Sequence, residues 1–278
     1  MTLDAGFLDR YQAVMAKWPV PYESLDLPGR FGTTHVNVCG PADGSPVVLM
    51  HGGRATSAGW FNTVGAFAGR HRVYAIDTIG DSGRSVADGE RIRDRDGIVS
   101  WLDETLSLLG VTAAAFVGHS VGAWNSMSYA LAHPDRVSRL VLLDPTSCVV
   151  GNRPTFMLRA IPLMLRPGPE RYRSFIRWET RGASLDPAWL ELWAGRFGGP
   201  TGGAWPKRPP AAELARLTMP VLVVVAGRSR QNDARRLATL TPKIIPGVRM
   251  ATLANASHFT IPQQDFEDLN PVLAEYLG

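Results

Sequence analysis

Runs of Val, Ile, Leu and Ala that are long enough for buried strands recur along the 278-residue chain. Strands that are apolar on both faces are typical of a parallel sheet with helices on either side. The segments between the runs have helical spacing, so the sequence predicts an α/β fold. The predicted strands are 46–53, 72–80, 113–120, 139–147 and 220–227, with weaker ones near residue 35 and at 248–255. The predicted helices are 95–110, 122–134, 230–242 and 264–278, the last with a potential break at Pro271.

One stretch, residues 146–218, breaks this alternation. It contains many prolines and glycines, no convincing strand and several helical pieces that carry Arg and Trp. A structureless loop of about seventy residues is uncommon in a compact domain. We therefore predict a helical cap at 146–218, inserted after the sixth strand, and a core domain made of 1–145 and 219–278. An elaborated crossover connection is the alternative.

The composition excludes several classes of protein. The chain is 45% hydrophobic and 19% charged, with a net charge of +4 and no Lys/Arg-rich block, so we expect no nucleic-acid partner. We expect neither a signal peptide nor a membrane span, because no apolar run approaches about 18 residues. The two cysteines, Cys39 and Cys148, form no metal-binding motif. The expected protein is cytoplasmic, a monomer or homodimer, and free of metal and cofactor.

The pentapeptide Gly118-His119-Ser120-Val121-Gly122 lies between a predicted strand and a predicted helix. A serine at such a sharp turn has a strained backbone, and the residues two before and two after it lie too close for side chains, so glycine is needed. The turn exposes the hydroxyl at the carboxyl end of the sheet, beside the N–H groups of a helix N-terminus. A tight turn with an unreactive serine is the alternative interpretation.

With these motifs the chain resembles the α/β-hydrolase family over nearly its full length. The resemblance implies a mostly parallel sheet covered by helices on both faces, an oxyanion loop after the third strand, a nucleophile elbow and a late histidine loop. The segments that carry it are HGG (51–53), DTIGDSGRS (77–85), GHSVG (118–122), HPDRVSRLVLLDP (133–145) and ANASHF (254–259).

A serine is a weak nucleophile that needs a base within hydrogen-bond reach, and the base needs an orienting carboxylate. The family order is Ser, acid, His. We therefore predict Ser120 as the nucleophile and His258, which follows a late strand, as the base. The resemblance implies an oxyanion hole formed by the backbone N–H groups of Gly53 and Val121.

The acid is ambiguous. The family usually carries it in a G-x-x-D pattern after the strand that reads PVLVVVAG, but this chain has Arg230 there. Asp144 ends the preceding strand and would lie one strand away, about 5 Å, from the usual position. Asp233, a few residues past Arg230, could reach back from a longer loop. We predict Asp144, with Asp233 as the alternative, and a site without a true acid is also open.

Trp60 and Trp124 flank the oxyanion and elbow motifs and are predicted to shape the substrate pocket, although both could be packing residues. The predicted function is a serine hydrolase that cleaves an ester or thioester of a small, largely apolar molecule through an acyl-enzyme. The alternatives are a C–C hydrolase or a biosynthetic lyase or cyclase on the same fold. A small-molecule receptor or signalling protein without turnover is a further alternative.

Overall fold

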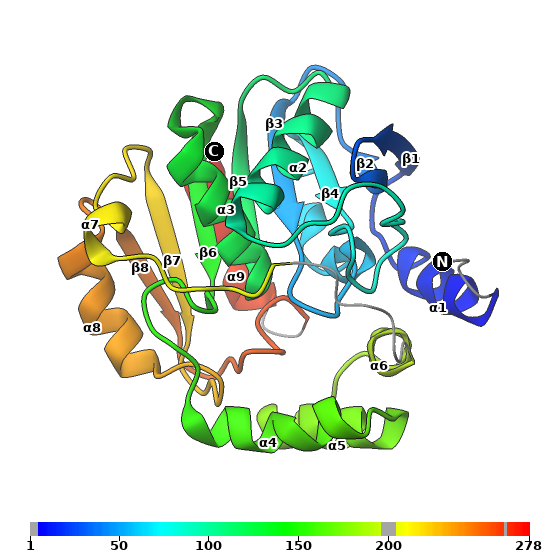
Figure 1. Ribbon diagram of the computed structural model, residues 1–278, viewed down its shortest axis with the longest axis vertical. Helices are drawn as coiled ribbons and strands as arrows, with labels where there is room; N and C mark the ends of the chain where they lie inside the picture. The colour runs from blue at the N-terminus through cyan, green and yellow to red at the C-terminus, as the bar shows by residue number, and fades with distance from the viewer. Residues whose placement is uncertain (1–4, 196–203, 264–265) are drawn as a thin grey trace.

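Eight strands form one sheet in the computed structural model, which describes residues 5–195, 204–263 and 266–278 (Figure 1). Their order across the sheet is β1-β2-β4-β3-β5-β6-β7-β8. β1 and β2 are antiparallel to their neighbours, and every other pair is parallel. The strands are β1 (Tyr22–Gly29), β2 (Gly32–Cys39), β3 (Ser45–Met50), β4 (His71–Ile76), β5 (Ala114–His119), β6 (Val137–Leu143), β7 (Val221–Ala226) and β8 (Arg249–Leu253).

Helices cover both faces of this sheet. In β3, Val47 and Leu49 pack into one core cluster and Val48 and Met50 into the other, as expected for a strand buried on both sides. The first cluster includes side chains of α1 (Ala5–Met15) and α9 (Phe266–Leu277). The second includes side chains of α2 (Arg95–Leu108), α3 (Val121–Ala132) and α8 (Ala234–Ile244). Short 3-10 helices lie at Ser57–Trp60, Val64–Ala66 and Pro134–Arg136.

The predicted α/β class is confirmed, and the differences from prediction lie at the edges. β1 was not predicted, because as an edge strand it is mostly exposed and lacks an apolar run. α8 begins at Ala234, later than expected, because the Asp233 side chain caps its N-terminus by accepting a hydrogen bond from the N–H of Arg236. α9 continues through Pro271, and positions 264–265 of its predicted range lie outside the described residues.

The described residues between β6 and β7 form four helices, of which the first three lie beyond the carboxyl ends of the strands and the last lies beside α8 (Figure 1). We call residues 146–218 the inserted segment, of which 196–203 lie outside the described residues. Phe156 and Phe175, from two of its helices, pack edge to face with ring centroids 5.1 Å apart. The helices are α4 (Pro154–Leu165), α5 (Pro169–Glu179), α6 (Pro187–Ala194) and α7 (Ala211–Leu214). Among the described residues, no helix is long and apolar enough to span a bilayer.

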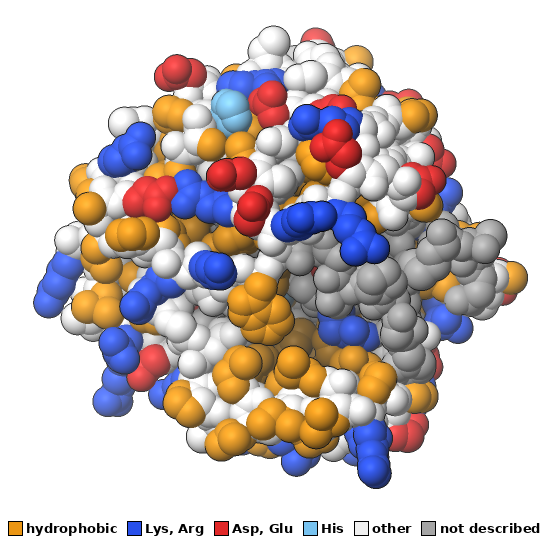
Figure 2. All heavy atoms as spheres, viewed as in Figure 1, with side chains coloured by type: hydrophobic (Ala, Val, Ile, Leu, Met, Phe, Trp, Pro, Cys, Tyr) orange, Lys and Arg blue, Asp and Glu red, His pale blue; other side chains and the backbone are white. Residues whose placement is uncertain are grey.

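α4 exposes several large apolar side chains. Figure 2 shows hydrophobic side chains gathered at the lower edge of the molecule, where α4 lies. Met164 and Leu165 are 67% and 76% exposed, and Trp205, which precedes α7, is 68% exposed. The inserted segment therefore presents apolar surface to its surroundings, in contrast with the covered strands of the sheet.

Candidate active site

The backbone of Ser120 has the strained geometry that its motif predicts. Its φ of 56° and ψ of −118° lie in a region that side-chain-bearing residues rarely adopt. A Cβ placed on Gly118 would lie 2.4 Å from the carbonyl oxygen of Gly122, and one on Gly122 would lie 2.1 Å from that of Met50. Only glycine fits at either position, and the resulting turn places the serine at the junction of β5 and α3.

The imidazole of His258 lies between Ser120 and Asp144. Its Nε2 is 2.8 Å from Ser120 Oγ, and its Nδ1 is 2.6 Å from Asp144 Oδ2. All three residues are at most 5% exposed. A carboxylate can only accept, so Nδ1–H donates to Asp144 and Nε2 accepts the hydroxyl proton of Ser120. This is the protonation pattern that a general base requires.

Asp144 is held in place by the end of β7 and the loop that follows it. Ser229 Oγ donates to its Oδ2 at 2.9 Å, and the N–H of Ala226 approaches its Oδ1 at 3.4 Å. The alternative acid, Asp233, lies elsewhere: it caps α8 and lies 3.6 Å from an Arg153 guanidinium nitrogen. The N–H of Arg236, more than the neighbouring arginines, lowers the pKa of Asp233. Of the two aspartates, only Asp144 touches His258.

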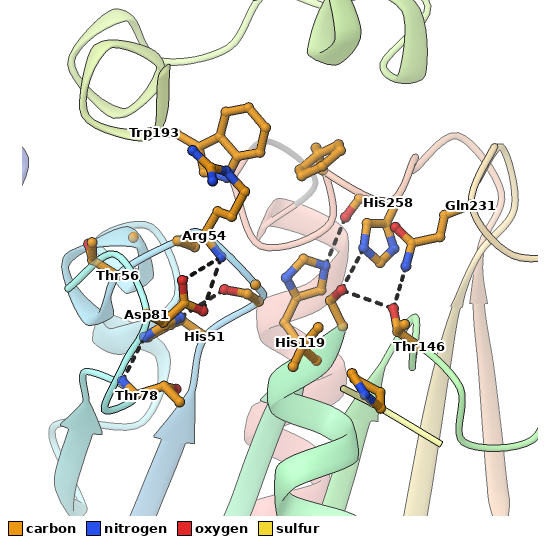
Figure 3. A pocket seen from close by; sticks show the side chains of 18 of the residues that line it. His51, Arg54, Thr56, Thr78, Asp81, His119, Thr146, Trp193, Gln231 and His258 are labelled. Atoms are coloured by element: carbon orange, nitrogen blue, oxygen red, sulfur yellow. Dashed lines mark hydrogen bonds between the residues drawn. The ribbon is translucent and has the colours of Figure 1, made fainter. Parts of the chain in front are cut away.

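The HGG loop lies against the serine from the other side. A Cβ on Gly52 would lie 3.2 Å from Ser120 Cβ, and one on Gly53 would lie 3.2 Å from Val121 Cγ2. Gly53 and Val121, the predicted oxyanion donors, are therefore adjacent. The next residue is also fixed, because the Asp81 carboxylate accepts the N–H of Arg54 at 3.0 and 3.1 Å (Figure 3).

His51, the first residue of this loop, is neutral and acts as a brace. Its Nδ1–H donates to the carbonyl of Gly52 at 2.8 Å, while its Nε2 accepts the N–H of Thr78 at 2.9 Å. A protonated imidazole could not accept the second bond. His51 thereby ties the loop after β3 to the loop after β4.

Sequence reasoning missed two polar groups beside the serine. Thr146 Oγ1 lies 3.0 Å from Ser120 Oγ, and Gln231 Nε2 donates to Thr146 Oγ1 (Figure 3). Because Ser120 gives its proton to His258, the Thr146 hydroxyl donates to Ser120. Thr146 follows Asp144 by two residues, so the position of the predicted acid was a signal that could have found it. No comparable signal marks Gln231.

His119 is a third residue that the motif analysis did not assign. Its ring packs beside that of His258, with centroids 4.9 Å apart, and its Nε2–H donates to the backbone carbonyl of His258 at 2.9 Å (Figure 3). Burial, followed by the neighbouring His258, holds the pKa of His119 well below its ordinary value of 6.5. His119 is therefore a neutral support for the histidine loop (residues 254–261).

A cavity of about 590 Å³ opens onto Ser120 between the strand ends and the inserted segment. Trp60 lines it, whereas Trp124 is buried in the core and donates its indole N–H to the carbonyl of Lys207. The charged lining side chains among the described residues are Arg54 and Asp81. Most of the lining residues that the inserted segment contributes are apolar. The large ones are Phe156, Met157, Leu163, Met164, Tyr172, Phe175, Trp189, Trp193 and Trp205.

The described residues contain no group of three or more His, Cys, Asp or Glu side chains arranged to hold a metal ion. Both cysteines are buried and free. Burial raises the pKa of the Cys39 thiol to about 12, although the charge of Arg72 acts in the opposite direction. Neither observation offers a metal centre within the described part of the chain.

Comparison with known proteins identifies the family of the chain. The profile described as "Alpha/beta hydrolase family" matches residues 47–271, so the chain belongs to the alpha/beta hydrolase family, and it is a hydrolase. Carboxylesterase YbfK of Bacillus subtilis (strain 168) is 28% identical over 268 residues, which cover 93% of this chain and 89% of that protein.

Two solved structures have the same fold over at least 98% of this chain. The structure of carboxylesterase CesB (YbfK) from Bacillus subtilis superposes with a TM-score of 0.90 at 26% identity, covering 98% of this chain and 97% of the other. Naproxen esterase (carboxylesterase NP) from the same organism gives a TM-score of 0.90 at 24% identity, covering 100% of both chains. The second likeness is one of fold.

Proposed function

We propose that the chain is a serine carboxylesterase that cleaves esters or thioesters of small, largely apolar molecules. The observation that carries the proposal is the hydrogen-bonded path from Ser120 through His258 to Asp144, with separations of 2.8 and 2.6 Å. A hydroxyl with a base in reach, and a base with an orienting carboxylate, is the arrangement that acyl transfer needs. The relatives named as carboxylesterases support the same reaction class.

In the proposed reaction, Ser120 Oγ attacks the carbonyl carbon while its proton passes to Nε2 of His258. The imidazolium so formed donates to Asp144 through Nδ1. When the tetrahedral intermediate collapses, the C–O or C–S bond breaks and His258 protonates the leaving alcohol or thiol. A water molecule, deprotonated by His258, then attacks the acyl-enzyme and releases the carboxylic acid, which restores Ser120.

The proposed oxyanion hole consists of the N–H groups of Val121 and Gly53. Val121 is the first residue of α3, where N–H groups point out of the helix and the helix dipole favours negative charge. Gly53 lies against Val121 and lines the cavity. Donors of this kind each contribute about 3–4 kcal/mol to transition-state stabilisation.

The cavity supports an uncharged, largely apolar substrate. Its two charged lining side chains among the described residues, Arg54 and Asp81, have opposite signs, so neither charge dominates. The Arg54 guanidinium also stacks over Tyr172, 4.2 Å from the ring centroid. Aromatic and aliphatic walls with a few polar groups are typical of small-molecule sites. We further propose that the inserted segment acts as a cap, with Met164 and Trp205 at the apolar entrance.

The alternatives have less support. Arg230 at the usual acid position mildly raises the lyase or cyclase alternative, but Asp144 lies 2.6 Å from His258 and supplies a carboxylate there. One neighbour of the fold is a C–C hydrolase, 2-hydroxy-6-oxo-6-phenylhexa-2,4-dienoate hydrolase, at 20% identity and a TM-score of 0.74. No feature of this cavity favours its substrate over an ester. A receptor without turnover would not need the hydrogen-bonded path.

Hydrolysis of p-nitrophenyl acetate and butyrate tests the proposal. We expect turnover that the substitution Ser120→Ala lowers by about 10⁴- to 10⁶-fold, because the nucleophile is lost. Ser107→Ala, at an exposed position of α2, is the matched control and should behave like the wild type. Equally slow release of nitrophenol by the wild type and Ser120→Ala would reject the esterase and favour the receptor alternative.

The remaining expectations concern the setting of the enzyme. A cytoplasmic monomer or homodimer that acts on a small molecule, without cofactor, nucleic acid or membrane partner, stays the prediction from the sequence. Apart from substrate and water, the proposed reaction uses only side chains and backbone groups of this chain. Light scattering coupled to gel filtration would decide between monomer and dimer.

A further inference from the structure

Glu179, the last residue of α5, belongs to the inserted segment but is bonded to loops of the core. Its side chain is fully buried, at 0% exposure. Oε1 accepts the backbone N–H groups of His258 and Arg230, both at 3.1 Å. Oε2 accepts the hydroxyl of Ser257 at 2.8 Å and the N–H of Phe259 at 3.2 Å. Three consecutive residues of the histidine loop therefore converge on one carboxyl group.

The four partners of Glu179 are all donors, so its side chain acts only as an acceptor, as an ionised carboxylate does. No Lys or Arg side chain in the described part of the chain forms an ion pair with it. Removing a carboxylate from water costs free energy that these N–H and O–H groups must offset. A side chain that only filled space at the end of α5 would not need a carboxylate.

These bonds act on the residue that carries the proposed base. The N–H of His258 is held by Glu179 at 3.1 Å, and its carbonyl accepts the Nε2–H of His119 at 2.9 Å. With both sides of the backbone fixed, the imidazole starts from a defined position when it spans Ser120 and Asp144. Geometry of this kind is what general-base catalysis depends on.

A second contact ties the same loop to the inserted segment. The ring of Phe259 packs edge to face against Trp193 of α6 and Phe175 of α5, with centroids 5.3 and 6.2 Å away. Beside Glu179, the ring of Trp178 lies under the guanidinium of Arg230 at 4.8 Å. The C-terminal end of α5 thus contacts both the loop after β7 and the histidine loop.

We propose that Glu179 is a positioning residue, which fixes the histidine loop to α5 so that His258 reaches Ser120 and Asp144 together. The inference rests on the proposed esterase function and deepens it. If Glu179 has this role, His258 is correctly placed only while α5 stays in contact with the histidine loop. An inserted segment that opened by lifting the end of α5 would break four hydrogen bonds to the core and release the backbone of His258.

The test is Glu179→Gln, which keeps the size of the side chain but replaces one acceptor oxygen by an NH₂ that faces other donors. Reaction with a phosphonate, followed to completion, counts the molecules whose Ser120 is reactive. The rate of p-nitrophenyl butyrate hydrolysis is then divided by that number to give kcat per reactive serine. We expect kcat to fall about 10- to 100-fold, because the base is misplaced, while KM stays unchanged. Glu170→Gln is the matched control: it lies on the same helix, is exposed, and should leave both constants unchanged.

A purely structural role predicts a different result, in which Glu179→Gln lowers the melting temperature or the titrated fraction but keeps kcat per titrated serine. That result would overturn the proposal. If Glu179→Gln does not fold, Glu179→Asp decides, because it keeps the carboxylate but draws it back from the backbone N–H of His258. A fall in kcat at unchanged KM supports the proposal, and a wild-type kcat overturns it.

The same experiment separates this inference from the proposed function. If the wild type shows no Ser120-dependent hydrolysis, the esterase itself fails. If the wild type depends on Ser120 but Glu179→Gln retains its kcat, only the role of Glu179 fails.

Discussion

The strand ends of the core and the helices of the inserted segment are held in place by different means. Ser120 and Asp144 each follow the paired residues His119 and Leu143 of neighbouring parallel strands, so the sheet register alone brings them side by side. By contrast, α4 exposes large apolar side chains and rests on the core through few of its residues. The comparison indicates that the sheet places Ser120 and Asp144, while α4 is less constrained.

After loss of the nucleophile itself, the largest expected effect lies at a strand end. Asp144→Asn should lower kcat for p-nitrophenyl butyrate by about 10⁴-fold, because the amide favours the wrong tautomer of His258. Asp233→Asn is the control, because asparagine also caps a helix well and Asp233 does not contact His258. We expect its kcat and melting temperature to match the wild type. A larger loss in Asp233→Asn than in Asp144→Asn would reverse the assignment of the acid.

Much of the core could be predicted because burial on both faces leaves a plain signal. The buried strands β3 to β7 coincide with the apolar runs, and the glycines around Ser120 predict the strained turn. The acid was ambiguous because two aspartates follow the right strands. What separates them is whether each side chain points to His258 or to a helix N-terminus, and the sequence does not encode that by spacing alone.

An intermediate effect is expected in the inserted segment. Met164 lines the cavity, whereas its neighbour Leu165 is similarly exposed but does not. Met164→Ala should raise KM for p-nitrophenyl butyrate about 3- to 10-fold, through lost apolar contact, and leave kcat unchanged. Leu165→Ala should leave both constants unchanged. Equal effects of the two substitutions, or an effect on kcat, would contradict the division between reacting groups and substrate contacts.

The smallest expected effect concerns stability in acid. Burial lowers the pKa of His119 well below 6.5 in the folded protein, so between that pKa and about pH 6.5 the unfolded chain binds the extra proton. The free energy of unfolding should therefore decrease as the pH falls through this window, by at most about 1.4 kcal/mol per pH unit from this group. His119→Gln, which keeps an N–H donor, should weaken that dependence.

Urea unfolding at pH 7.5 and pH 5.0 checks this expectation for both proteins. Other groups that titrate in the window are common to the two, so the difference between the pH dependences isolates His119. Identical dependences would show that the buried imidazole does not resist protonation, and would remove His119 as a neutral support of the histidine loop.

The contacts between the two regions could not be predicted from the sequence. Glu179 and Gln231 carry no motif, and their partners lie 51 to 85 residues away along the chain. These contacts depend on how the helices cross the core. The composition of the sequence indicates only that a helical segment is present. For the same reason Trp124, adjacent to the elbow in sequence, points into the core while the more distant Trp193 lines the cavity.

The most direct test of the central claim is a crystal structure of the enzyme after reaction with a p-nitrophenyl phosphonate. The account predicts phosphorus bonded to Ser120 Oγ, and a phosphonyl oxygen about 3 Å from the N–H groups of Gly53 and Val121. It also predicts that His258 keeps its bond to Asp144. Phosphorus on another residue, or an imidazole turned away from both Ser120 and Asp144, would contradict it.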